Sequence, residues 1–371
     1  MRPRLTPDGN VLITGLTGLI GGELFRTLAA RGHAGNVWAL VRPTVGRDPD
    51  ARVRERLARS GDRGPPGCRL TPVAGDILEP HWGLSRADRD EIAAGVDVIV
   101  HSAADTSFAA RPGVARTNVE GVRRLIEFAR SCRRNPLVVY LSTASNVGRV
   151  AGRCVAEDHG CRPENDHFNE YTHSKAVGEW LVRESGLPVL VLRPTIVLSG
   201  GLPDPRFARQ ILWCAPLGRV FRALPVDPAG RIDVVDVEFV AEAAVRLMTC
   251  RTRSHDCYHL SAGPGGAVTV GEVSGLVDRA YGRRTPLRLI PPGEWTRAEH
   301  RTFVRTRLQR EVFRSLRHYL PFLNMDVVYD DARLRADLGA AAPAVRPLDE
   351  YLPDLLRRIR SVAALREAAL P

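Results

Sequence analysis

A glycine-rich loop between an apolar strand and a helix is the feature that most restricts how this chain can fold. Residues 10–14 form a short, β-branched run that predicts a buried strand. The loop that follows carries Gly15, Gly18 and Gly21, and residues 23–31 then have the composition of a helix. Glycines in such a loop let the backbone turn tightly and approach a pyrophosphate, which binds at the helix N-terminus. The start of the chain therefore predicts a dinucleotide-binding site.

The rest of the N-terminal half repeats this alternation of strands and helices. We expect further strands over residues 37–41, 70–74, 96–100, 137–141 and 187–192. Strands that alternate with helices in this way predict an α/β fold with a doubly wound parallel sheet of the Rossmann type. Ligands of such sheets bind at the carboxyl ends of the strands, so residues at those ends become candidates for the site.

Those strand ends carry residues suited to a dinucleotide. Arg42 follows the second strand, where an acidic residue would bind the ribose hydroxyls of NAD and an arginine suits the 2′-phosphate of NADP. We therefore expect NADPH rather than NADH, with a solvent-facing arginine as the alternative in a chain of 53 basic residues. Asp76 follows the third strand and is expected to bind the adenine amino group. Small residues at 102–104 let a cofactor pass close to the backbone.

Tyr171 and Lys175 form a second constraint, because a spacing of four places both side chains on one face of a helix. Lys175 is the one lysine among 53 basic residues, which suggests a role that the planar guanidinium of arginine does not fill. A cation beside a tyrosine lowers the tyrosine pKa and lets it pass a proton near neutral pH. The alternative is an ordinary surface pair on an amphipathic helix.

Charge and composition limit the partners. The formal net charge of +11 favours a phosphorylated cofactor, an acidic protein, an anionic membrane surface or nucleic acid. The arginines are spread along the chain without interleaved aromatic residues, which argues against nucleic acid. No apolar run approaches the roughly 18 residues of a transmembrane segment, and the start of the chain does not resemble a signal peptide. Seven cysteines without a C-x-x-C pair predict free thiols in a reducing cytoplasm, and no metal site is expected.

Six stretches of the sequence together resemble one branch of the extended short-chain dehydrogenase/reductases. The branch holds fatty acyl-CoA reductases and the thioester reductase domains of carboxylic acid reductases and of peptide and polyketide synthetases. The pattern G-D-x-x-x-P-x-x-G-L-S, together with H-S-A-A, is its most specific part. The stretches that carry the resemblance are residues 73–85, 96–104, 118–121, 141–144, 169–176 and 193–197.

The resemblance implies roles for the matching residues. Thr143 takes the place of the catalytic Ser/Thr, Tyr171 that of the acid, and Lys175 that of the residue that lowers the tyrosine pKa and holds the nicotinamide ribose. Asn118 takes the place of a helix asparagine near the active site and completes the expected catalytic set. Besides Tyr171 and Lys175, the residues expected to bind the cofactor are Thr14, Gly15, Thr17, Gly18, Leu19, Ile20, Gly21, Arg42, Asp76, Ile77, Ser102, Ala103, Ala104, Arg193, Pro194 and Thr195.

The resemblance also implies how the chain is divided. We expect an NADP-binding domain over residues 1–200, with a returning segment near 228–250, and a smaller, interleaved substrate domain over most of residues 201–371. Residues 200–217, rich in proline, glycine and aromatics, would begin the second domain, and residues 258–261 resemble one of its strands.

A basic helix is predicted within this second domain. Apolar residues recur every four positions over residues 304–320, with arginines between them. Such a face could dock an acidic carrier protein or the phosphates of CoA, touch an anionic membrane, or simply be solvated.

These observations predict an NADPH-dependent reductase that converts an acyl thioester into an aldehyde, with an alcohol as the product of a second reduction. Because the sequence carries no adenylation or carrier segment, we expect the thioester to arrive on CoA or on a separate acidic carrier protein. The same Thr-Tyr-Lys set also serves reduction of a free ketone or aldehyde and epimerisation or dehydration of a nucleotide sugar. A non-catalytic NADP-sensing protein is a third alternative, which the presence of both Tyr171 and Lys175 disfavours.

Overall fold

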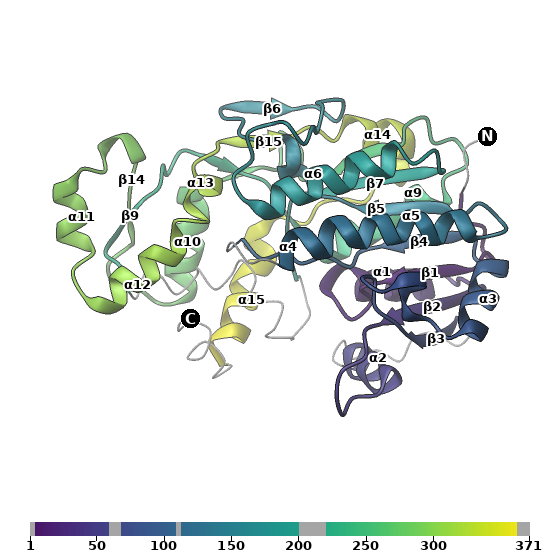
Figure 1. Ribbon diagram of the computed structural model, residues 1–371. Helices are drawn as coiled ribbons and strands as arrows, with labels where there is room; N and C mark the ends of the chain where they lie inside the picture. The colour runs from purple at the N-terminus through teal and green to yellow at the C-terminus, as the bar shows by residue number, and fades with distance from the viewer. Residues whose placement is uncertain (1–3, 59–67, 109–112, 200–219, 362–371) are drawn as a thin grey trace.

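The computed structural model describes residues 4–58, 68–108, 113–199 and 220–361, and its centre is a parallel sheet of seven strands (Figure 1). The strand order is β12-β7-β5-β4-β1-β2-β3, with β1 between β2 and β4. This confirms the predicted doubly wound sheet, since successive strands are added outward from β1 first on one side and then on the other. The strands are β1 (Val11–Thr14), β2 (Asn36–Val41), β3 (Arg69–Ala74), β4 (Val98–His101), β5 (Leu137–Leu141), β7 (Val189–Pro194) and β12 (Cys257–Leu260).

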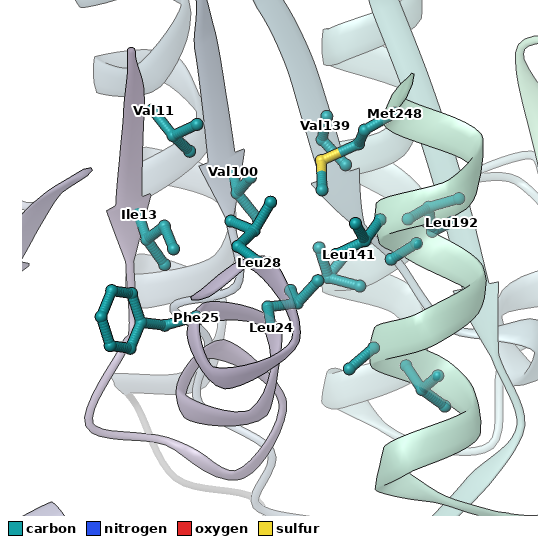
Figure 2. Packing of buried hydrophobic residues seen from close by; sticks show 14 of the residues in the cluster. Val11, Ile13, Leu24, Phe25, Leu28, Val100, Val139, Leu141, Leu192 and Met248 are labelled. Atoms are coloured by element: carbon teal, nitrogen blue, oxygen red, sulfur yellow. The ribbon is translucent and has the colours of Figure 1, made fainter. Parts of the chain in front are cut away.

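Helices cover both faces of the sheet. On one face α1 (Leu19–Ala30) and α9 (Val237–Thr249) pack their apolar side chains against the inner strands, and Leu24, Leu28 and Met248 lie among the strand residues in Figure 2. The opposite face is covered by α3 (Arg86–Gly95), α5 (Gly121–Ser131) and α6 (Glu170–Arg183). Because both faces are buried, the strands consist almost entirely of apolar residues, as the sequence predicted.

Most of the elements after β7, other than α9 and β12, build a second hydrophobic cluster beside the sheet, which we call the small lobe (Figure 1). Two short pairs of strands, β10 with β13 and β14 with β9, contribute to it, and two more pairs, β11 with β8 and β15 with β6, lie outside the large sheet. These strands are β6 (Arg153–Val155), β8 (Ile196–Leu198), β9 (Ala223–Pro225), β10 (Arg231–Ile232), β11 (Val234–Asp236), β13 (Val268–Thr269), β14 (Arg288–Ile290) and β15 (Val327–Tyr329). The later helices are α10 (Val270–Ala280), α11 (Arg297–Phe303), α12 (Arg307–Leu316), α13 (Leu320–Leu323), α14 (Ala332–Leu338) and α15 (Leu348–Ser361).

Two sequence expectations were wrong in detail. The strand at residues 257–260 does not belong to the small lobe but pairs with β7 at the edge of the large sheet. The helix expected over residues 304–320 is shorter in the structure: α11 ends at Phe303, α12 covers Arg307–Leu316 and α13 begins at Leu320, because Thr306 and Gln309 form a capping box that starts α12. Residues 200–217, expected to begin the substrate domain, lie outside the described residues. None of the helices in the described ranges is long and apolar enough to span a membrane.

Candidate active site

The glycine loop packs closely against the backbone at the ends of β1 and β4. Gly15 has a φ of +76°, and a Cβ on it would lie 2.7 Å from the backbone nitrogen of Ala103. A Cβ on Gly21 would lie 2.4 Å from the carbonyl oxygen of Gly15. Gly18 is the N-cap of α1, and no side chain caps the first amides of the helix. The loop therefore fits a pyrophosphate, which these amides can bind.

Thr14 and Ser102 join the ends of β1 and β4. The Thr14 hydroxyl oxygen lies 3.0 Å from Nδ1 of His101 and accepts a hydrogen bond from the amide of Ala103. Ser102 donates its hydroxyl to the carbonyl of Thr14. Burial, together with the charge of Lys175, lowers the pKa of His101 to about 3, so this histidine is neutral. These contacts fix the two strand ends over which a cofactor would lie.

The segment after β3 presents Asp76 through an unusual turn. The amide of Asp76 donates to the carbonyl of Trp82, and its carboxylate accepts from the amide of Leu78. His81 and Trp82 have φ values of 50° and 60°, which L-residues seldom adopt, and Trp82 is held there by stacking on Phe128 at 4.4 Å. The most specific family pattern in the sequence therefore encodes this turn.

Other expected cofactor residues lie along the same edge of the sheet. Thr17 and Ile20 are half-buried in the loop and the first turn of α1, whereas Leu19 packs on Val237. Arg42 is exposed directly after β2 and forms no ion pair within the described residues. Ile77 lies beside Gly121, Ala104 follows β4, Pro194 ends β7, and the Thr195 hydroxyl donates to Asp233.

Arg56 is a residue that the sequence interpretation missed. Its side chain is buried, donates from Nε to the carbonyl of Gly18 at 3.2 Å, and lies over Gly22, where a Cβ would be 2.6 Å from Nη2. It thus ties α2 (Pro49–Ala58) to the glycine loop. The available signal was the extra glycine at position 22, which a dinucleotide loop alone does not require.

Thr143, Tyr171 and Lys175 come together at the carboxyl ends of β5 and β4. Thr143 is the N-cap of a short 3-10 helix (Ala144–Val147), and its side chain lies near the hydroxyl of Tyr171. Burial raises the pKa of Tyr171 to about 12, although the nearby Thr143 hydroxyl acts in the opposite direction. The expectation that the pKa of Tyr171 is lowered therefore does not hold in this structure, because burial outweighs the neighbouring polar groups.

Lys175 is almost completely buried one helical turn after Tyr171. Its ammonium donates to the carbonyl of Leu141 and lies 4.3 Å from the centroid of the Tyr140 ring. Burial lowers the pKa of Lys175 to about 7, against the charge of Glu179, which favours the ammonium form. Lys175 itself is thus able to exchange a proton near neutral pH.

Asn118 lies in a π-helical turn (Arg116–Glu120), and its amide group is fully used for positioning. It accepts from the amide of Asp105, and donates to the carbonyl of Asp105 and to the hydroxyl of Ser174. Asn118 therefore joins the segment after β4 to the residue that precedes Lys175.

A buried carboxylate, Glu179, lies one turn beyond Lys175 and links the elements of the site. It accepts from Arg193 at 2.6 Å, from Ser142 at 2.7 Å and from Asn146 at 2.8 Å. Burial would raise its pKa, but Arg193 outweighs burial and lowers the pKa of Glu179 to about 2. The expected cofactor contact of Arg193 is revised accordingly: its buried side chain is held by Glu179 and by carbonyls of residues 157 and 159.

Replacing Glu179 with glutamine leaves Arg193 buried without its counter-charge, so we expect the free energy of unfolding to fall by about 3–5 kcal/mol at pH 7. In the wild type the carboxylate stabilises the fold above its ordinary pKa of 4.5, and this contribution is lost as the pH falls toward 2. Urea unfolding should show that the free energy of unfolding of the wild type falls between pH 7 and pH 3. Glu179→Gln should lack this fall. Glu242→Gln removes partly exposed pairs with Arg31 and Arg246 and serves as the control, with an expected cost of about 1 kcal/mol or less.

The sheet and the glycine loop at its strand ends define a dinucleotide-binding fold of the extended short-chain dehydrogenase/reductase type. A family model described as male sterility protein, an NAD-binding family, matches residues 13–244. The chain belongs to this family. The resemblance predicted from the sequence is thereby confirmed, and a nicotinamide dinucleotide is its class of cofactor.

Curated relatives of the chain include larger proteins. It is 29% identical over 261 residues to a component of the linear gramicidin synthase of Brevibacillus parabrevis, across 67% of this chain and 5% of that protein. It is 24% identical over 328 residues to a putative fatty acyl-CoA reductase of Drosophila melanogaster, across 76% and 60%. It is 30% identical over 298 residues to a carboxylic acid reductase of Mycobacterium marinum, across 69% and 25%. The chain thus spans from 5% to 60% of the length of these relatives.

Solved structures with the same fold include reductase domains. The terminal R domain of the myxalamid PKS-NRPS biosynthetic pathway superposes with a TM-score of 0.73 at 25% identity, covering 99% of this chain and 93% of that one. The reductase (R) domain of a nonribosomal peptide synthetase from Mycobacterium tuberculosis gives 0.68 at 25% identity, covering 99% and 94%.

Proposed function

We propose that this protein reduces an acyl thioester, carried on CoA or on an acidic carrier protein, to an aldehyde with NADPH as the reductant. The observation that carries the proposal is the cluster of Thr143, Tyr171 and Lys175 at the strand ends of a chain that belongs to this family. The names of its relatives, among them fatty acyl-CoA reductases and a carboxylic acid reductase, support the thioester as the substrate class.

Each residue of the cluster has its own role in the reaction. A bound reduced nicotinamide supplies the hydride for the thioester carbonyl carbon. Tyr171 protonates the oxygen as negative charge develops on it, and the neighbouring Thr143 hydroxyl is placed to hydrogen-bond the same oxygen. Lys175, with a pKa of about 7, is placed to restore the proton to the site. The resulting hemithioacetal collapses to an aldehyde and a free thiol, and a second reduction would give the alcohol.

The glycine loop, Asp76 and Arg42 are the groups we assign to the dinucleotide. Arg42 is exposed after β2, without a carboxylate partner in the described residues, and a guanidinium there matches a 2′-phosphate. We expect Arg42→Ala to raise KM for NADPH by about 10–100-fold, since it removes a charge-assisted hydrogen bond, and to leave KM for NADH unchanged. Initial rates with both cofactors measure this. An equal rise in KM for NADPH and NADH would show that Arg42 does not bind the 2′-phosphate.

A cavity in the small lobe suits the acidic end of the substrate. It has a volume of about 850 Å³ and is lined by Arg222, Arg283, Arg284 and Arg305, with no carboxylate among the described residues of its lining. Arg283 pairs with Asp278, whereas Arg222, Arg284 and Arg305 are exposed. We infer that this cavity, rather than one continuous basic helix, binds the phosphates of CoA or acidic groups of a carrier.

For the double variant Arg222→Gln/Arg284→Gln we expect KM for an acyl-CoA to rise by about tenfold, because two exposed ion pairs are lost. KM for the matching N-acetylcysteamine thioester, which has no phosphate, should not change. Arg301→Gln/Arg314→Gln removes two exposed charges outside the cavity lining and is the control. A similar rise for both thioesters, or for both double variants, would contradict the assignment of the cavity.

Incubation of the protein with NADPH and acyl-CoA thioesters of several chain lengths tests the proposed function. We expect one equivalent of free thiol for each NADPH oxidised to the aldehyde stage. Absence of both changes with CoA thioesters and carrier-bound thioesters would refute the proposal. Cofactor that stays tightly bound and is not consumed would instead favour epimerisation of a nucleotide sugar.

A further inference from the structure

Aromatic rings extend from Tyr171 toward the small lobe. The ring of Phe108 stacks on the ring of Tyr171, with centroids 5.6 Å apart. Phe108 also contacts Tyr319 at 5.0 Å and Phe322 at 4.7 Å. We call Phe108, Tyr319 and Phe322 the aromatic wall. Phe168 extends it through a contact with Phe322 at 4.8 Å.

The wall joins two parts of the chain that are far apart in sequence. Phe108 lies in the segment that follows β4, whereas Phe322 lies in α13 and Tyr319 is the N-cap of that helix. Figure 1 shows α13 at the side of the small lobe that faces α6. The residue that we propose as the acid therefore borders a surface to which both lobes contribute.

Hydrogen bonds hold each half of the wall in place. Asn118 binds both the amide and the carbonyl of Asp105, which fixes the segment that carries Phe108. Asn324, directly after α13, donates to the carbonyl of Pro225 and accepts from the amide of Asp227. The half-buried rings are thus preorganised, and a surface of this kind can discriminate between ligands without first being ordered.

We propose that the aromatic wall contacts the acyl group next to the reacting carbonyl and selects apolar acyl groups over very short or polar ones. The inference rests on the proposed function, because a carbonyl that Tyr171 protonates must place its acyl substituent near the rings around Tyr171. A phenyl face covers methylene groups and offers no charged partner to a polar substituent. Each methylene that the wall removes from water adds about fourfold to kcat/KM.

The test compares octanoyl-CoA with acetyl-CoA as substrates. The wild type should favour octanoyl-CoA by more than about tenfold in kcat/KM, and Phe108→Ala and Phe322→Ala should each lower this ratio by about tenfold. Phe313→Ala removes a ring of the small lobe that packs on Trp295, outside the wall, and should leave the ratio unchanged. Leucine at position 108 or 322 replaces any alanine variant that does not fold, with a smaller fall expected.

A binding measurement separates this inference from the proposed function. Binding of octanoyl-CoA and of CoA is measured by calorimetry without a nicotinamide cofactor. Both wall variants should bind octanoyl-CoA more weakly than the wild type does, whereas their affinity for CoA should not change. If that contrast appears while no thioester is reduced, the proposed function fails and the wall remains an acyl-binding surface. A wild-type ratio of kcat/KM for octanoyl-CoA over acetyl-CoA near one would overturn the inference. So would wall variants that change neither this ratio nor the affinity for octanoyl-CoA relative to CoA.

Discussion

Replacing Tyr171 with phenylalanine is expected to lower kcat for thioester reduction by about 10²–10⁴-fold, the range of general acid catalysis. Phenylalanine keeps the ring that stacks on Phe108 and removes only the hydroxyl that lies near Thr143. KM should therefore change little, because the loss concerns the transition state rather than substrate binding. Initial rates of NADPH oxidation at saturating thioester measure the effect.

Tyr351→Phe is the matched control for this substitution. Tyr351 is buried in the small lobe, and its hydroxyl has no hydrogen-bond partner in the described residues. Removing this hydroxyl should leave kcat within about twofold of the wild type, because no hydrogen bond is lost with it. A Tyr171→Phe enzyme with unchanged kcat would show that another group supplies the proton.

Replacing Lys175 with arginine is expected to lower kcat by about a hundredfold, although the charge is kept. The ammonium of Lys175 is buried between the Leu141 carbonyl and the Tyr140 ring, where the wider guanidinium does not fit without displacing α6. Arginine also stays protonated at every working pH, whereas the pKa of Lys175 is about 7. Steady-state rates and the pH dependence of kcat measure both effects.

Lys175→Gln distinguishes shape from charge in this experiment. If only the charge of Lys175 matters, Lys175→Arg retains activity and Lys175→Gln does not. We expect kcat to fall by about a hundredfold or more in both variants, with circular dichroism confirming that they are folded. An active Lys175→Arg enzyme would mean that the single lysine among so many arginines reflects codon use rather than chemistry.

Local patterns in the sequence were sufficient to predict the sheet. Alternating apolar runs and helices, and the glycines at 15, 18 and 21, depend on neighbours in sequence, and the structure contains each of them. The edge strand at 257–260 was misplaced because its partner, β7, lies over 60 residues earlier, and pattern alone does not reveal such pairing. The break in the basic helix was visible as a capping box at Thr306, but apolar periodicity concealed it.

The sequence could predict which residues form the candidate site, but not their pKa values or ion pairs. Spacing placed Tyr171 and Lys175 on one face of a helix, yet the pKa of Tyr171 depends on burial by distant segments. Arg193 appeared suitable for a cofactor because nothing in sequence shows that Glu179 neutralises it. Arg56 and Phe108 were missed for the same reason, since their contacts are made only when separate elements pack together.

The most direct measurement of the central claim follows the hydrogen that reaches the acyl carbon. NADPH labelled with deuterium at the transferring position of the nicotinamide ring is incubated with an acyl thioester, and the products are analysed by mass spectrometry and thiol titration. Our account predicts that the aldehyde carries the deuterium on its carbonyl carbon and that one thiol is released for each aldehyde formed. Release of thiol without NADPH oxidation, or oxidation of NADPH that leaves no deuterium on the acyl carbon, would contradict it.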